Sequence, residues 1–437
     1  MKKWLQPTLV MFSALCALAS LMLPFNSTFA ATLPKKAIYV LPGYMGSQLF
    51  LESGTPLWLG PAIALDILTP LHSPLANHAD GTGMRAKEGS TQRADSTFDE
   101  YGVLNVYETL VNGLRGAFDK NHGGTGAYEV IFFPYNWLGD LNESAAKLET
   151  HINQNGYSSV VLIGHSTGGL LAACYMARGN TPPKVEKAIF IATPFYGSYS
   201  ALEALEFGTQ VQAQNALTDI IKGGFLQGSI LGGLAKTVVE AYYKTYVRTM
   251  VRNSPTTYQL LPSDEYLSAT PVQTTFVEFR WEKLKRVPYE TLSSHNSAEG
   301  FYAVLNNSAY TKRINTRLVN GNTTRSHQYF REVALGNNIS GMLSSIGADN
   351  VLLIGNKGGN SVTGFLTPTS AHYTSRGVLC LNCDEALDIV YSYDGDGVVS
   401  AFSAALPGFR FSNYAGIAHL ELAKDSRVVL QIIAEII

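Results

Sequence analysis

Three residues that stand far apart in the chain, Ser166, Asp396 and His419, are of the types that carry out acyl transfer. In such a set the serine hydroxyl attacks an acyl carbon and the histidine takes the serine proton as general base. The aspartate holds the imidazole tautomer and stabilises its charge. Ser166 is the centre of a Gly-x-Ser-x-Gly motif at residues 164–168. This chemistry requires a fold that brings the three side chains together.

The residues around Ser166 predict a strand, a sharp turn and a helix. Residues 160–163 are β-favouring and apolar, and the residues from Leu170 onward are typical of a buried helix. The turn between them would strain the serine backbone, while Gly164 and Gly168 avoid side-chain collisions. The amide of Thr167, at a helix N-terminus, would stabilise a developing oxyanion. Taken alone, the motif is also compatible with an ordinary strand-to-helix turn.

Strands and helices alternate on both sides of this turn. Apolar runs predict strands at residues 37–41, 128–133, 187–192 and 350–355, with a possible further strand at 409–413. Helical spacing of apolar residues predicts helices at 103–118 and 142–152. This order is typical of an α/β protein with a mostly parallel, doubly wound sheet, which binds ligands at the carboxyl ends of its strands. We therefore expect an α/β-hydrolase fold, with a second oxyanion-hole amide in the turn at residues 42–47.

Two stretches interrupt the alternation. Residues 51–101 contain glycine, proline and aspartate without a clear period, which predicts a loop-rich excursion over the surface. From residue 201 to residue 349, apolar segments studded with glycine predict an inserted helical cap, or a mobile lid over a lipid-binding groove. The expected organisation is a signal peptide at 1–30, a core formed by 31–200 and 350–437, and the cap or lid at 201–349.

In this fold the catalytic residues follow the chain order serine, acid, histidine. Of the nine histidines, only His419 follows the aspartates at 394 and 396, so the order selects it. His165, beside the nucleophile, receives no role, because a neighbour along a tight turn is expected to point elsewhere. Asp394 is a competing acid. A calcium loop at 394–405 is the other interpretation, but Val398 and Ala405 stand where EF-hand ligands would be needed.

The first 30 residues have the composition of an export signal. Two lysines are followed by an apolar region at residues 9–23 and by a small-x-small site that ends at Ala30. We predict cleavage after Ala30 and export to the periplasm or the outside, as is typical of bacterial signals; an uncleaved anchor is the alternative. Any later membrane contact would be peripheral. A formal charge of −2 offers no basic surplus for a nucleic-acid partner.

Three of the four cysteines, Cys174, Cys380 and Cys383, follow the predicted signal peptide. Cys174 lies in the apolar helix after the turn, where we expect a small buried core residue. Cys380 and Cys383 could form a local disulfide in an oxidising compartment, or a redox Cys-x-x-Cys. A zinc site would need a second ligand pair, and no such pair stands at a suitable spacing. We expect neither a metal nor another cofactor.

Seven segments together resemble the lecithin:cholesterol acyltransferase family of α/β-hydrolases, and they follow the family order. They are Pro-Gly-Tyr-Met-Gly-Ser-Gln-Leu at 42–49, Pro-Tyr-Asn-Trp at 134–137, Gly-His-Ser-Thr-Gly-Gly at 164–169, Thr-Pro-Phe-Tyr-Gly-Ser at 193–198, Ser-Pro through Leu-Leu-Pro-Ser at 254–263, Asp-Gly-Asp-Gly-Val-Val at 394–399 and Gly-Ile-Ala-His-Leu at 416–420. The chain departs from the family at 136–138, where Asn-Trp-Leu replaces the usual Asp-Trp-Arg, and it lacks the early cysteine pair of the animal enzymes.

The resemblance implies an enzyme that forms an acyl-serine from a phospholipid or other ester and passes the acyl group to water or an alcohol. It assigns Ser166, Asp396 and His419 as the catalytic triad, with Asp396 preferred to Asp394 as the acid. It places the oxyanion hole at the amides of Met45 and Thr167. The aromatic residues of the matching segments, Tyr44, Trp137 and Phe195, are the expected substrate-binding residues.

The partners expected are a lipid ester and, peripherally, a membrane or lipid aggregate, while the oligomeric state stays open. Two other functions compete with this interpretation. One is a soluble carboxylesterase or thioesterase that an interface does not activate. The other is a non-catalytic binding protein with an α/β-hydrolase fold, against which the complete serine, acid and histidine order argues.

Overall fold

The computed structural model describes residues 35–49, 106–178, 185–198, 200–201, 254–260, 339–357, 365–368, 387–390 and 395–437. The chain divides into two units, Met1–Lys35 and Lys36–Ile437, and every described helix and strand belongs to the second unit. The predicted signal peptide, the excursion at 51–101, most of the insertion at 201–349, Asp394, Cys380 and Cys383 lie outside the described residues. The expectations for those parts of the chain stay predictions.

Six parallel strands form the central sheet. In sheet order they are β2 (Glu129–Phe132), β1 (Lys36–Leu41), β3 (Ser159–His165), β4 (Val185–Ile191), β5 (Val351–Gly355) and β8 (Arg410–Asn413). Because β1 lies between β2 and β3, the direction of winding reverses beside β1. In open parallel sheets the crevice for a ligand lies at such a switch point, at the carboxyl ends of the strands. Two more strands, β6 (Phe365–Pro368) and β7 (Leu387–Val390), form a separate antiparallel pair.

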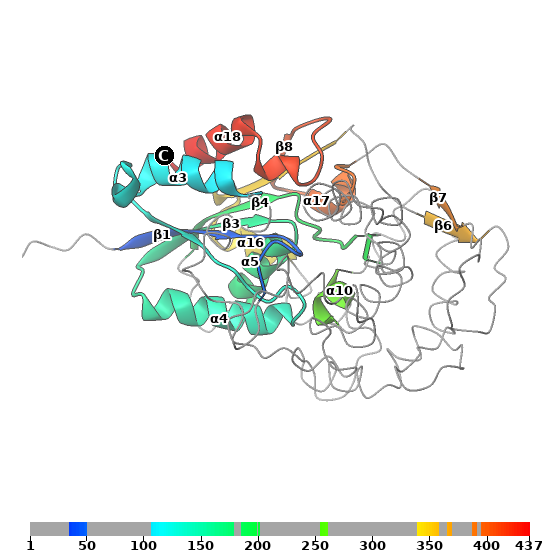
Figure 1. The fold of residues 1–437 in the computed structure, drawn as a ribbon, viewed down its shortest axis with the longest axis horizontal. Helices are drawn as coiled ribbons and strands as arrows, with labels where there is room; N and C mark the ends of the chain where they lie inside the picture. Colours follow the sequence, from blue (N-terminus) through cyan, green and yellow to red (C-terminus); the bar gives the residue numbers. More distant parts are fainter. Residues whose placement is uncertain are drawn as a thin grey trace, which may run out of the picture. The chain divides into compact units, whose positions relative to one another are not determined.

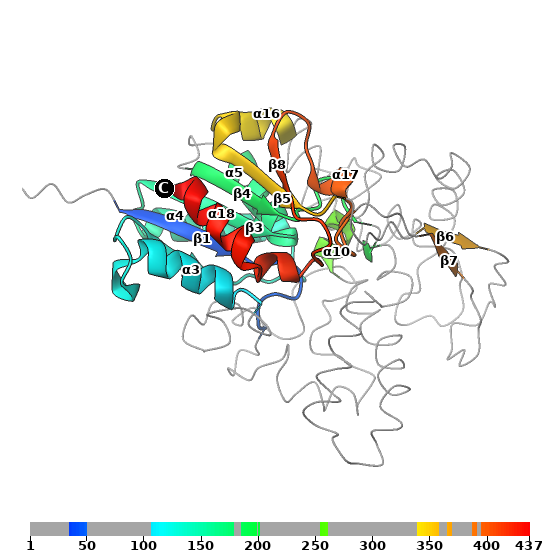
Figure 2. The same cartoon turned by 90° about the horizontal axis from the view of Figure 1, so that it is seen from above.

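Helices cover both faces of the sheet (Figures 1 and 2). On one face α3 (Glu108–Phe118) packs beside α18 (Ser426–Ile436), and on the other face lie α4 (Leu141–Gln154), α5 (Thr167–Ala177) and α16 (Ile339–Ser344). Side chains of β1 alternate between the two layers: Ile38 and Val40 pack with the core of α3 and α18, and Tyr39 and Leu41 pack with that of α4 and α5. The sheet is therefore buried on both faces, as parallel sheets require.

Short helices complete the described elements, and several of them border the carboxyl ends of the strands. They are η3 (Lys120–His122), α10 (Pro255–Gln259), η7 (Ala348–Asn350), α17 (Ala401–Ala404) and η8 (Glu421–Ala423). In Figure 2, α10 and α17 lie beyond the strand ends. Helix α10 lies within the predicted insertion at 201–349, and α17 closely follows the segment at 394–399 that contains Asp396.

The predicted strands and helices of the α/β core are present, with shifted ends. Helix α3 begins at Glu108, not at residue 103, because Val106 and Tyr107 form a turn before it. Helix α4 begins at Leu141 because the Asp140 side chain accepts a hydrogen bond from the Asn142 amide. Strand β4 ends at Ile191, and Ala192 adopts a positive φ of 49°. Cys174 is a free, fully buried cysteine, as predicted.

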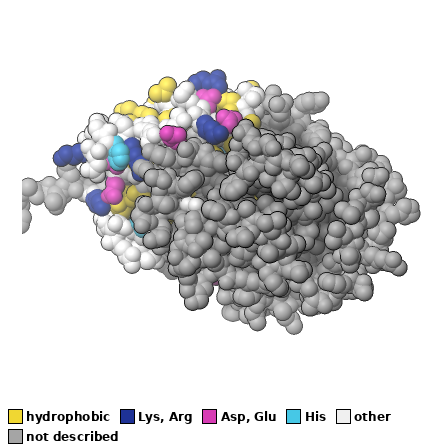
Figure 3. All heavy atoms as spheres, viewed as in Figure 1, with side chains coloured by type: hydrophobic (Ala, Val, Ile, Leu, Met, Phe, Trp, Pro, Cys, Tyr) yellow, Lys and Arg dark blue, Asp and Glu magenta, His cyan; other side chains and the backbone are white. Residues whose placement is uncertain are grey.

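Helix α18 was not predicted, although its spacing carries a signal. Val428, Val429, Ile432 and Ile436 are buried and lie on one face of the helix. On the described surface in Figure 3, which includes α3 and α18, basic and acidic side chains are interspersed. Among the described residues, no helix has the length and apolar character needed to cross a membrane.

Candidate active site

Ser166 occupies the turn between β3 and α5, as the motif predicts. Its backbone has φ 53° and ψ −126°, a conformation that a residue with a side chain rarely adopts. Two hydrogen bonds hold the turn: the Ser166 amide donates to the Ile191 carbonyl at 2.8 Å, and the Gly169 amide donates to the Ser166 carbonyl at 2.9 Å. The strain is thus held by the end of the neighbouring strand and by the first turn of α5, which is the geometry of a nucleophile elbow.

Gly168 allows the elbow to pack against the end of β1. A Cβ atom at this position would overlap the carbonyl oxygens of Leu41 and Pro42. Only a residue without a side chain lets the helix backbone approach the strand exit so closely. Gly43, in the loop that follows β1, is close to Ser166 in the same way, since a Cβ added there would lie 3.0 Å from Ser166 Cβ.

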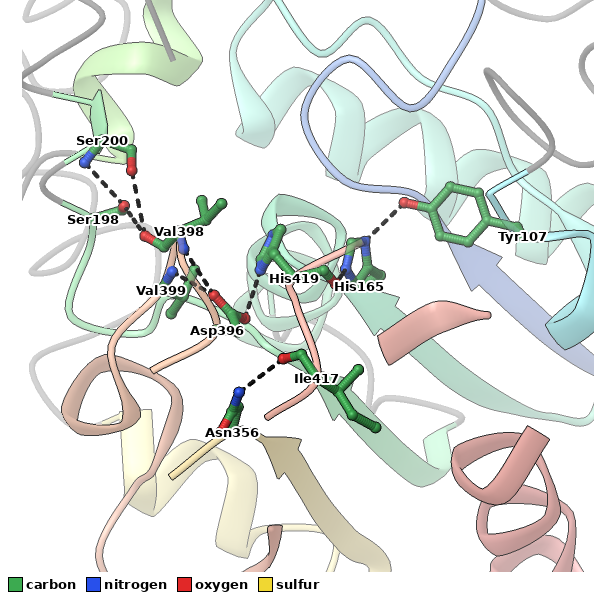
Figure 4. A network of polar contacts seen from close by, with 10 residues as sticks. All are labelled: Tyr107, His165, Ser198, Ser200, Asn356, Asp396, Val398, Val399, Ile417 and His419. Carbon is green, nitrogen blue, oxygen red and sulfur yellow. Dashed lines mark hydrogen bonds and ion pairs between the residues drawn. The ribbon is translucent and has the colours of Figure 1, made fainter. Parts of the chain in front are cut away.

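Asp396 and His419 are hydrogen-bonded to each other in the buried interior of the site (Figure 4). The Nδ1 atom of His419 lies 2.7 Å from Asp396 Oδ2, and the His419 amide donates to the Asp396 carbonyl at 2.9 Å. The other carboxylate oxygen, Oδ1, accepts the amides of Val398 at 2.9 Å and Val399 at 2.8 Å. Because Asp396 engages Nδ1, the arrangement leaves Nε2 as the basic nitrogen of the imidazole.

Two polar side chains that the sequence analysis did not single out position these loops. Asn356 directly follows β5, and its amide nitrogen donates to the Ile417 carbonyl at 2.8 Å while its oxygen accepts the Gly416 amide at 3.2 Å. The Ser198 hydroxyl donates to the Val398 carbonyl at 2.7 Å. Asn356 thereby holds the loop before His419, and Ser198 holds the loop after Asp396. A polar residue directly after a buried strand was the available signal for Asn356.

His165 takes part in the site, contrary to the expectation that it points elsewhere. Its ring packs against that of His419 with 4.8 Å between centroids, and its Nε2 lies 3.1 Å from the His419 carbonyl oxygen. Its Nδ1 lies 2.9 Å from the Tyr107 hydroxyl. The end of β3 therefore directs the His165 side chain toward the loop of His419. His165, the residue before Ser166, contacts the proposed base.

The residues predicted for the oxyanion hole lie in the loop after β1 and at the start of α5. Met45 follows β1 in a turn closed by a hydrogen bond of 2.9 Å from the Gly46 amide to the Gly43 carbonyl, and its φ is 63°. Thr167 is the first residue of α5. Both positions are at the carboxyl end of a strand, and the oxyanion-hole assignment stays a prediction.

The predicted substrate-binding residues differ in exposure. Trp137 and Phe195 are fully buried in the hydrophobic core, and the Trp137 indole donates to the Ser47 carbonyl at 2.9 Å. Tyr44 is partly exposed, stands edge-on to Trp137 at 4.8 Å and shares a hydrogen bond of 3.1 Å with Thr257 of α10. Of the three, Tyr44 has exposed surface in this state, and the binding roles stay predictions. The described residues contain no group of three or more His, Cys, Asp or Glu side chains suited to a metal ion.

Part of the chain matches a known domain family, and solved structures of low sequence identity are similar to it. The family model described as a PGAP1-like alpha/beta domain matches residues 141–263, which include the elbow. A search among curated proteins found no match. Among solved structures, a chain of the Tle4–Tli4 complex is similar, with 15% identity, a TM-score of 0.47 and coverage of 93% of this chain and 98% of that one. The mature lipase BlEst2 of Bacillus licheniformis shows 13% identity, a TM-score of 0.29 and coverage of 92% of each chain.

The sheet order, the strained elbow and the match to the PGAP1-like domain agree with one another. The protein has an α/β-hydrolase fold.

Proposed function

We propose that the protein is an exported serine acyl hydrolase or acyltransferase that acts on lipid esters, as a phospholipase A or a lipid O-acyltransferase of the lecithin:cholesterol acyltransferase type. The observation that carries the proposal is the buried hydrogen bond between Asp396 and His419, beside an elbow that strains Ser166. A buried aspartate engaged to Nδ1 of a histidine is the arrangement that prepares an imidazole for general-base catalysis.

The proposed reaction proceeds through an acyl-serine. Ser166 Oγ attacks the ester carbon while His419 Nε2 takes the hydroxyl proton, and Asp396 stabilises the resulting imidazolium. The amides of Met45 and Thr167 hold the negative charge of the tetrahedral intermediate. The C–O bond of the ester then breaks, and His419 returns the proton to the leaving alcohol. Water or an acceptor alcohol repeats the sequence on the acyl-serine and releases the acid or a new ester. The scheme needs no cofactor.

Sequence features support a lipid over a soluble ester. The insertion at 201–349 contains apolar, glycine-studded segments, which suit a cap or lid over an acyl chain. The signal-like segment at 1–30 supports export, where an enzyme meets membrane lipids from outside the cytoplasm. Tyr44, a partly exposed tyrosine that stands edge-on to the buried Trp137, is the aromatic surface proposed to meet the substrate near the oxyanion turn.

The test measures acyl release from phosphatidylcholine vesicles by the chain that begins at Ala31, with a sterol or a lysolipid present or absent. We expect release that disappears in Ser166→Ala and persists in Ser345→Ala, a matched change at an exposed serine. An acylated acceptor would identify a transferase. Ser166-dependent activity on short soluble esters alone would contradict the lipid assignment. Equal rates of hydrolysis by the wild type and Ser166→Ala on all esters would contradict the proposal that the protein is a serine hydrolase.

A further inference from the structure

A bridge of hydrogen bonds through Tyr107 and His165 connects the loop after β1 with the loop of His419. The Gly43 amide lies 2.7 Å from the Tyr107 hydroxyl, and that hydroxyl lies 2.9 Å from Nδ1 of His165. The Nε2 atom of His165 in turn lies 3.1 Å from the carbonyl oxygen of His419. Figure 4 shows the part of this bridge from Tyr107 through His165 to His419. The reaction scheme above uses neither Tyr107 nor His165.

The chemistry of the partners sets the direction of every hydrogen bond. The carbonyl of His419 can only accept, so Nε2 of His165 carries the proton. A neutral imidazole has one N–H, so its Nδ1 is bare and accepts from the Tyr107 hydroxyl. The Tyr107 oxygen accepts the Gly43 amide. Each donor of the bridge thus meets an acceptor. All three hydrogen bonds are donated in the same direction, from Gly43 toward His419.

Both side chains of the bridge are buried. Tyr107 and His165 are each 1% exposed, so an unmatched polar atom there would be costly. Burial, and secondly the neighbouring His419, lower the pKa of His165 to about 3. His165 therefore stays neutral at any pH near 7, and it brings no positive charge beside the imidazolium that His419 would become.

The bridge ends on the two segments whose spacing matters for the proposed reaction. Gly43 lies close to Ser166, since a Cβ added at Gly43 would lie 3.0 Å from Ser166 Cβ, and its carbonyl closes the turn that contains Met45. At the other end, the His419 backbone carries the imidazole that is bonded to Asp396. Errors of about 1 Å in such spacing can reduce a rate by about a hundredfold.

We propose that Tyr107 and His165 are positioning residues: their hydrogen-bonded bridge sets the residue 43–46 turn and the base His419 at a fixed spacing on either side of Ser166. The inference rests on the proposed function of that site. His165 occupies the position between the motif glycine and the serine, so the elbow supplies both the nucleophile and the support for its base.

The test compares Tyr107→Phe, His165→Gln, His165→Leu and the double variant Tyr107→Phe/His165→Gln. Each is measured for hydrolysis of p-nitrophenyl butyrate and for the rate at which a fluorophosphonate labels Ser166. We expect Tyr107→Phe to lower kcat about tenfold, because it removes both buried hydrogen bonds of the Tyr107 hydroxyl and loosens the spacing that they hold, with KM changed less than about twofold. His165→Gln keeps an amide donor for the His419 carbonyl, so it should lose less activity than His165→Leu.

The double variant separates a bridge from two independent structural effects. If Tyr107 acts through His165, the double variant loses about as much as the worse single variant. Tyr39→Phe is the matched control. Tyr39 is a buried tyrosine bonded to His151 Nδ1 at 2.7 Å, with 5.6 Å between the rings, as for Tyr107 and His165. It faces the opposite layer, and its variant should keep kcat and the labelling rate of the wild type.

The outcomes distinguish the bridge from the proposed function. A wild type that neither hydrolyses esters nor is labelled at Ser166 contradicts the proposed function. An active wild type with unchanged Tyr107→Phe, with an equal loss in Tyr39→Phe, or with additive losses in the double variant overturns the bridge. Imidazole ¹⁵N chemical shifts test it without turnover: a neutral His165 protonated on Nε2 is expected at pH 7, and a cation or a proton on Nδ1 overturns it.

Discussion

The side chains of Asp396 and His419 meet at 2.7 Å although 23 positions separate them in the chain. A second bond, from the His419 amide to the Asp396 carbonyl, joins the same residues through the backbone. The two loops are therefore tied together before any substrate binds. Asp396 is bonded through both side-chain oxygens and its carbonyl, which makes the orientation of its carboxylate a property of the fold.

We predict that Asp396→Asn lowers kcat by a factor of about a thousand or more with little change in KM. The amides of Val398 and Val399 require an oxygen at the Oδ1 position, so the asparagine nitrogen would face His419 Nδ1. That nitrogen can only donate, which forces the proton of His419 onto Nε2 and removes the base. Steady-state kinetics on the ester substrate measure the effect.

Asp394→Asn is the matched control, since Asp394 is the competing acid. It should keep kcat within about threefold of the wild type. A larger loss in Asp394→Asn than in Asp396→Asn would transfer the role of the acid to Asp394.

We predict that Gly168→Ala destabilises the elbow and abolishes most activity. The new Cβ would overlap the carbonyl oxygens of Leu41 and Pro42, so α5 or the β1 exit must move away. Forced overpacking of this kind typically costs about 1–3 kcal/mol in the free energy of unfolding. Chemical denaturation and ester hydrolysis measure the two effects.

Gly116→Ala provides the control in a second helical glycine. Gly116 is exposed on α3, and a Cβ there would have no atom within 4 Å. Alanine should raise the free energy of unfolding by about 0.5–1 kcal/mol and leave activity unchanged. Equal stability changes in the two variants would contradict the packing explanation.

We predict that neutral His165 makes the protein lose stability in acid. Its pKa is about 3 in the folded protein against 6.5 ordinarily, so between these values the unfolded chain binds the extra proton. The contribution to stability is complete above pH 6.5 and is lost as the pH falls. At pH 4.5, His165 lowers the free energy of unfolding by about 2–3 kcal/mol. The reason is that each pH unit below 6.5 favours proton binding by the unfolded chain about tenfold.

Urea unfolding at pH 7.5 and at pH 4.5 measures this loss. His165→Gln cannot titrate, so the difference between its two free energies of unfolding should be smaller than in the wild type by about 2–3 kcal/mol. His122→Gln, at an exposed histidine of η3 whose Nδ1 lies 3.4 Å from Asp119 Oδ2, is the comparison variant, and it should reduce the wild-type difference by less than His165→Gln does. An identical pH dependence in His165→Gln and the wild type would show that His165 is not held neutral by burial.

Much of the core could be predicted from the sequence, because local patterns encode it. Apolar runs identify β1 and β3, and the spacing of Leu110, Val111, Leu114 and Phe118 identifies the buried face of α3. The strained backbone of Ser166 also follows from its motif. The start of α3 was predicted too early because Tyr107 fits the apolar helical spacing, whereas Tyr107 lies in the turn before the helix and its hydroxyl bonds to His165 across the fold.

The role of His165 shows why a motif is an incomplete guide. Its neighbours along the chain give its position on the elbow, but they do not say which way the side chain leaves the strand. Its partners, Tyr107 and His419, lie 58 and 254 positions away. Asn356 is similar, since its bond to Ile417 spans 61 positions. Such contacts have no local pattern.

The sequence by itself determined the class of fold, the strained turn at Ser166 and the order of the candidate residues, because strand and helix periods and turn glycines act over a few residues. The tertiary structure alone decided that Asp396 bonds to His419, that His165 supports the His419 loop, and that Trp137 and Phe195 are buried. The physical reason is that parallel strands distant in sequence end at one edge of the sheet, where hydrogen bonds form between loops whose separation in the chain carries no signal.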